Sequence, residues 1–150
     1  MKTFQLTLLL ALGLWATQLQ ADDAALLSGK WLVKKVNDQG ETYRQTIQVK
    51  KDKFVFEILG ADDHLVLHAE GDLKLEKLGP FSSVRFIHIR AGNSLSTLDD
   101  VDDEYACVYK LDGDTWNLAS NFDKDRENQK PVVDVYQRVK TAPAHDGAGK

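Results

Sequence analysis

Hydrophobic and polar residues alternate with a period of two along most of the chain. In one run Leu65 and Leu67 alternate with His64 and His68, so the leucines share one face and the histidines the other. This period is that of half-buried antiparallel strands, and between residues 29 and 140 no apolar pattern keeps helical spacing for about 11 residues. The pattern predicts eight or nine strands, at 30–36, 42–49, 53–59, 64–69, 72–77, 84–90, 105–111, 115–120 and 132–140.

Turn-forming residues separate these runs at short, regular spacing. Glycine, proline, asparagine and aspartate gather at 37–40, 60–63, 79–80, 91–93 and 112–114. Short strands joined by hairpins build a barrel or a sandwich, and closure into a barrel removes the exposed edges that invite aggregation. The predicted fold class is therefore all-β, with a single antiparallel, up-and-down β-barrel.

The two ends of the chain differ from this pattern. Residues 1–21 have a positive start at Lys2, an apolar stretch and a small residue at Ala21, which predicts a signal peptide cleaved before Asp22. The apolar stretch is about 13 residues long, too short for a comfortable membrane span; an uncleaved anchor is the alternative. The domain is then expected at 22–140, and residues 141–150 form a disordered tail.

Charge and cysteine content narrow the classes of partner. The formal net charge is −4, and removing the signal takes away only Lys2, which leaves −5. A mildly acidic protein is a poor partner for nucleic acid or for an anionic membrane surface. Cys107 is the single cysteine, so no intrachain disulfide forms. We expect a buried thiol; a reactive one would need a nearby cation, for which the local sequence offers only Lys110.

The chain resembles a known family through an ordered set of motifs. Residues 27–33 contain the Gly-x-Trp that opens the first strand of lipocalins, and more closely the chain resembles a family of small exported bacterial lipocalin-like domains over about residues 26–140. The shared features are the Leu-x-Gly-x-Trp-x-Val opening, an Asp-x-Gly turn at 38–40, a Tyr-x-Leu-x-Gly-Asp hairpin at 109–114, and then Arg126, Pro131 and a closing strand that ends at Arg138. Two features depart from the family: four residues separate Arg126 from Pro131, and residues 94–104 are unusually acidic.

This resemblance implies a lipocalin-like barrel and a role in binding a small ligand or a protein. It also implies a structural pair. In lipocalins an Arg near the end of the chain covers the Trp of the first strand, so Arg138 is expected to lie across Trp31. Members of the resembled family mostly lack an established activity, so the likeness predicts the fold better than the function.

Catalytic and metal-binding patterns are weak. No serine lies in Gly-x-Ser-x-Gly, and no Ser-His-Asp set is apparent, so we do not expect an enzyme. His64 and His68 would lie about 13 Å apart on one strand, too far to share an ion. They are expected to face water, as is His88, and His145 falls in the tail. We expect no metal and no cofactor.

Two acidic stretches are interpreted as solvated loops. Residues 99–104 hold five carboxylates, which invites comparison with calcium sites. Residues 123–127 alternate acidic and basic side chains but lack the glycine and the glutamate that an EF-hand loop requires. The first stretch is predicted not to bind calcium tightly.

The barrel interior is the remaining candidate site. An eight-stranded barrel is just wide enough to be filled by side chains or to hold one small ligand. The alternation places ten candidates inside: Tyr43, Phe54, Phe56, Leu65, Leu67, Ile87, Ile89, Tyr109, Trp116 and Leu118.

Two functions from different classes remain open. The first is an exported module, periplasmic or secreted, that binds a small apolar or amphipathic molecule and keeps no membrane anchor after signal cleavage. The second is a protein-interaction module with a filled barrel, such as a secreted protease inhibitor or an envelope assembly factor. An apolar cavity above about 300 Å³ would favour the first.

Overall fold

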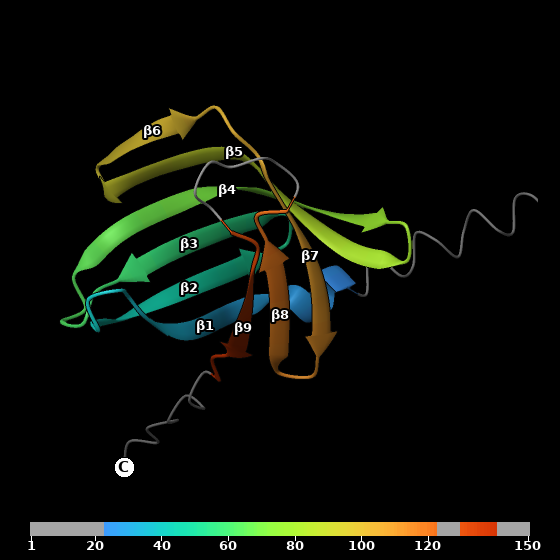
Figure 1. Cartoon of the computed structure of the whole chain (residues 1–150). Coiled ribbons are helices and arrows are strands. Elements are labelled where there is room, and N and C mark those ends of the chain that lie inside the picture. The colour runs from blue at the N-terminus through green and yellow to red at the C-terminus, as the bar shows by residue number, and fades with distance from the viewer. Residues whose placement is uncertain (1–22, 123–129, 141–150) are drawn as a thin grey trace, which may run out of the picture.

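The computed structural model describes residues 23–122 and 130–140, which form nine antiparallel strands and one helical turn over 23–27 (Figure 1). The strands are β1 (Gly29–Val36), β2 (Thr42–Lys50), β3 (Lys53–Leu59), β4 (Leu65–Leu78), β5 (Phe81–Ser94), β6 (Thr97–Val101), β7 (Tyr105–Asp112), β8 (Thr115–Ser120) and β9 (Val132–Arg138). The predicted signal peptide at 1–21, Arg126 and the tail at 141–150 lie outside the described residues.

Eight of these strands close into a barrel. The paired order runs β1-β2-β3-β4-β5-β7-β8-β9, and β9 returns to β1. β6 lies outside this ring and pairs only with the second half of β5. The predicted lipocalin-like, antiparallel barrel is therefore confirmed, and the alternating pattern is explained by an inner and an outer face on each strand.

Three predictions about strands and turns differ from the structure. The turn predicted at 91–93 lies inside β5, which continues to Ser94. Segments 64–69 and 72–77 belong to one long strand, β4, with a register shift at Gly71. The acidic run was interpreted as a loop, but Asp99, Asp100 and Val101 end strand β6. Charged residues are tolerated there because β6 is an edge strand, and charges on an edge discourage pairing with another chain.

One end of the barrel is closed by aromatic packing. Trp31 and Trp116 are fully buried with ring centroids 5.6 Å apart and planes at 64°, an edge-to-face contact. The helical turn covers them, since Leu27 is fully buried and its carbonyl accepts a hydrogen bond from the Trp31 indole at 2.8 Å. Tyr109 also donates its hydroxyl to Asp23 at 2.9 Å, which ties the turn to β7.

Arg138 lies across Trp31, as the resemblance implies. Its guanidinium carbon is 4.1 Å from the indole centroid, well within the range of a cation–π contact. The same guanidinium donates to the Ser28 carbonyl at 2.7 Å and to the Leu26 carbonyl. A Cβ at Gly29 would lie 2.9 Å from this guanidinium, so the glycine of the Gly-x-Trp motif leaves room for the arginine.

The prediction of which β4 side chains face the interior is confirmed, but the prediction that His68 is exposed to solvent is wrong. Leu67 faces the interior and His64 is exposed, yet His68 is only 6% exposed. Its ring lies on the outer face between two carboxylates, with Nδ1 3.4 Å from Glu57 and Nε2 3.7 Å from Glu70. Neighbouring side chains on a twisted sheet can thus bury an outward residue, which alternation alone does not reveal.

Among the described residues, no helix has the length and apolar character needed to span a membrane.

Candidate functional site

The end of the barrel opposite the tryptophan pair is hollow. A cavity of about 470 Å³ lies there, within the size range of ligand sites, and every strand of the described chain contributes to its lining. Large aromatic residues fill the other end, so the interior is filled in one half and open in the other.

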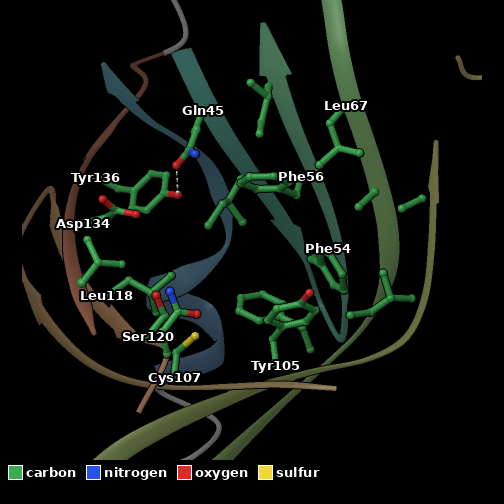
Figure 2. Close-up of a pocket in the computed structure, with 18 of the residues that line it drawn as sticks. Gln45, Phe54, Phe56, Leu67, Tyr105, Cys107, Leu118, Ser120, Asp134 and Tyr136 are labelled. Atoms are coloured by element: carbon green, nitrogen blue, oxygen red, sulfur yellow. Dashed lines mark hydrogen bonds between the residues drawn. The ribbon is translucent and has the colours of Figure 1, made fainter. Parts of the chain in front are cut away.

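The wall formed by β3, β4 and β5 is apolar. Phe54 and Phe56 line it from β3, and Leu67 lines it from β4 (Figure 2). Ile89 on β5 also belongs to this wall. Phe54 packs edge-to-face on Phe86 with centroids 4.8 Å apart, which fixes the base of this wall. No charged side chain of these three strands lines the cavity.

The opposite wall, formed by β1, β2 and β9, is polar. Tyr136 donates its hydroxyl to the Gln45 side-chain oxygen at 3.2 Å (Figure 2). Lys35 and Asp134 form an ion pair, with the ammonium 2.7 Å from one carboxylate oxygen and 3.0 Å from the other. Burial raises the pKa of the Tyr136 phenol far above its ordinary value, and the negative charge of Asp134 adds to this shift, so the hydroxyl stays protonated.

This polar wall coincides with the weakest seam of the barrel. β1 and β2 are paired along all of β1, whereas β1 and β9 share only two paired positions, at Trp31–Arg138 and Leu32–Gln137. Beyond these positions the side chains of Lys35 and Asp134 bridge the two strands in place of a backbone ladder. The seam therefore puts polar groups inside the cavity.

Five of the ten interior candidates line the cavity. They are Phe54, Phe56, Leu67, Ile89 and Leu118. Tyr109 and Trp116 are buried in the packed core and do not line the cavity. Tyr43 and Leu65 are half-buried on interior-facing positions but do not line it either.

The inward prediction for Ile87 is wrong. Ile87 is buried but lies outside the core cluster, and its pairing with Asp72 puts it on the face opposite to Phe86. The cause is a bulge: His88 and Ile89 together oppose Gly71, so the alternation changes phase between Ile87 and Ile89. The prediction that His88 faces outward is confirmed, because its side chain is 76% exposed.

The sequence interpretation missed the polar lining residues. Gln45, Asp134 and Tyr136 were not among the interior candidates, since Gln45 and Asp134 are polar and the closing strand at 132–140 supplied no candidate. The signal was present in β9, where Val132, Asp134 and Tyr136 occupy alternate positions and so share a face. Cys107 also lines the cavity and is buried, as predicted.

A second hollow lies on the outside, between β5 and residues 101–106. It is lined by Arg85 and His88 and by the acidic residues 102–104. Arg85 is already engaged, since it lies 3.0 Å from Glu76 and 3.4 Å from Glu104. Within the described ranges, no group of three or more histidine, cysteine or acidic side chains is arranged to hold a metal ion.

Comparison of the chain with protein-family models, with curated proteins and with solved structures finds no match.

Proposed function

We propose that this protein is a lipocalin-type binding module that holds one small amphipathic molecule in the open half of its barrel. The observation that carries the proposal is the cavity of about 470 Å³, which has an apolar wall on one side and a polar wall on the other. A site of this kind binds by burying apolar surface, and a few placed polar groups orient the ligand.

The alternative is a protein-interaction module acting through its surface. That reading expects a barrel filled by side chains, which describes the tryptophan end and not the opposite end. The exposed valines Val133 and Val135 on the outer face of β9 are the feature in its favour. We prefer the small-ligand function because the cavity exceeds the volume of about 300 Å³ from which ligand sites begin.

We further propose that the molecule works outside the cytoplasm, in the periplasm or after secretion. The support is the sequence of residues 1–21, with a charged start, a short apolar stretch and a small residue at Ala21. N-terminal sequencing of exported protein is expected to begin near Asp22, and a chain that still begins at Met1 would contradict the proposal.

Native mass spectrometry of the protein purified from its native cells tests the binding function. The expected result is a mass in excess of the chain alone, released as one small molecule on denaturation. The same protein, stripped of ligand, should bind the neutral apolar dye N-phenylnaphthylamine with enhanced fluorescence.

A pair of alanine substitutions assigns this binding to the cavity. Ala91 lines the cavity, whereas Ala119 lies on the outer face of β8, opposite Val133. Ala91→Leu is expected to weaken dye binding about tenfold or more by filling space, and Ala119→Leu is expected to leave it unchanged. Equal dye binding by both variants would place the dye elsewhere and remove the cavity from the proposal.

A further inference from the structure

We propose that the ligand of this cavity carries an uncharged head group that accepts a hydrogen bond, and that the Lys35–Asp134 ion pair makes this selection. The inference rests on the proposed function and goes further, since it distinguishes an alcohol, ester or amide from a fatty acid or an amine. It follows from the charges that line the cavity and from the Gln45 side-chain amide, whose nitrogen donates to no described residue.

The charges of the cavity cancel each other. Among its lining residues, Lys35 is the only lysine, arginine or histidine, and Asp134 is the only carboxylate. They contact each other through both carboxylate oxygens, at 2.7 and 3.0 Å, and their side chains are only 25% and 16% exposed. Each charge is therefore already compensated, and the polar wall has no net charge to offer a ligand.

A charged head group would have to lose its hydration without gaining a counter-ion. Burial of an unpaired ionised group is costly, and breaking the existing pair to serve the ligand would leave Lys35 or Asp134 unpaired in its place. An uncharged head group avoids both costs. The ion pair thus disfavours anions and cations alike.

Gln45 supplies the donor. Its side-chain oxygen accepts the Tyr136 hydroxyl at 3.2 Å, while no described residue accepts a hydrogen bond from its amide nitrogen. Gln45 lines the cavity on the same side as Asp134 and Tyr136, and the phenylalanines of β3 lie across from them (Figure 2). A ligand with its carbonyl or hydroxyl oxygen at Gln45 would place its apolar part against Phe54 and Phe56.

Three ten-carbon probes that differ only in head group test the selection. Decanol, decanoate and decylamine each compete with N-phenylnaphthylamine for the purified protein at pH 7. We expect decanol to displace the dye at a concentration about tenfold lower than either charged probe, the size of effect that one uncompensated charged contact produces. A decanoate that competes as well as decanol, or better, would overturn the inference.

Two substitutions should reverse the order of the probes. Asp134→Asn leaves Lys35 unpaired and is expected to make decanoate the best competitor, whereas Lys35→Gln leaves Asp134 unpaired and should favour decylamine. The double variant restores neutrality and should prefer decanol again. Each variant is first checked for a cooperative melting transition. If a single variant fails to fold, the remaining single variant and the double variant are compared with the wild type.

Glu76→Gln is the matched control. It changes the net charge by the same amount as Asp134→Asn and also removes one partner of an ion pair, but Glu76 pairs with Arg85 outside the cavity. It should leave decanol preferred. An unchanged probe order in both cavity variants would overturn the inference while the proposed function stands; failure of the dye and all three probes to bind would overturn the proposed function itself.

Discussion

Arg138 connects four parts of the chain through one guanidinium group. It lies 4.1 Å from the centre of the Trp31 ring, donates to the carbonyls of Ser28 and Leu26, and reaches Asp114 in the β7–β8 turn at 3.1 Å. A planar guanidinium suits this position, because it can stack on the indole ring while its N–H groups donate hydrogen bonds to several acceptors at once. Its contribution is to the closed end of the barrel and not to the cavity.

Replacing Arg138 should therefore destabilise the fold without changing the proposed ligand binding. Arg138→Ala is expected to lower the free energy of unfolding by about 2–4 kcal/mol, from the lost cation–π contact and from two backbone carbonyls left without their donor. Chemical denaturation measures the change, and Lys140→Ala is the control, since Lys140 approaches the same Asp114 but is 81% exposed. A loss as small as that of the control would mean that the guanidinium contributes little.

Tyr136 links stability to alkaline pH. Burial, with the charge of Asp134 adding to it, raises the phenol pKa in the folded protein above the ordinary value of 10.0. Because the folded pKa is raised, the contribution is fully present below pH 10 and is lost as pH rises, since the unfolded chain ionises first. We expect the free energy of unfolding to fall above about pH 10 by up to about 1.4 kcal/mol per pH unit.

A phenylalanine variant tests the assignment. Tyr136→Phe should reduce the alkaline decline in urea denaturation curves without abolishing it, because burial also raises the pKa of Tyr109. Parallel curves for Tyr136→Phe and the wild type would contradict the assignment.

At the scale of elements, the bulge between β4 and β5 determines which side chains reach the cavity. His88 has a φ of 50°, and together with Ile89 it opposes the single residue Gly71. This extra residue shifts the phase of β5, so that Ile89 and Ala91 face inward after Phe86 does. A bulge of this kind also bends the strands, which helps a sheet to close into a barrel.

Gly71 is the position at which this bulge is most easily tested. A Cβ there would lie 2.6 Å from the Ile87 carbonyl oxygen, a backbone atom that cannot rotate away. Gly71→Ala is expected to cost about 2–3 kcal/mol of stability in thermal or urea unfolding. Gly113→Asn is the control, because a Cβ at Gly113 meets nothing within 4 Å and asparagine tolerates its φ of 59°. Similar losses in both variants would count against the tight contact.

The edge strand β6 explains why its aspartates make a poor calcium site. Asp99 and Asp100 are neighbours in a strand, so their side chains point to opposite faces, and Asp100 lies 3.7 Å from the Arg90 guanidinium. Calcium needs six to eight oxygens that converge. Calcium at about 1 mM should therefore leave the melting temperature unchanged in a thermal scan; a rise of several degrees would require a real site by mass action.

At the scale of the whole molecule, the barrel has a packed end and a hollow end that meet at the β1–β9 seam. The packed end holds the chain termini of the domain together through the Trp31–Arg138 pairing. The hollow end lacks this ladder and relies on the Lys35–Asp134 bridge. The packed core and the cavity therefore lie at opposite ends of the barrel.

This division predicts an uneven pattern of hydrogen exchange. Peptides that cover residues 132–136 of β9, which do not pair with β1, should take up deuterium faster than peptides that cover β3, which is paired on both sides. Mass spectrometry of quenched samples measures this difference. Equal protection of the two segments would indicate that the seam is as stable as the rest of the barrel.

The sequence by itself determined the fold class and the facing of most strands, because both depend on the local alternation of apolar and polar residues. The Trp31–Arg138 pair was expected from the resemblance to lipocalins, and the structure shows that contact. Only the tertiary structure decided that His68 is buried, that Ile87 faces outward and that one wall of the cavity is polar. His68 is buried by side chains from two strands, and Ile87 is turned outward by a bulge that only strand pairing creates. The ion pair of Lys35 with Asp134 joins residues 99 positions apart, and only closure of the barrel brings them together.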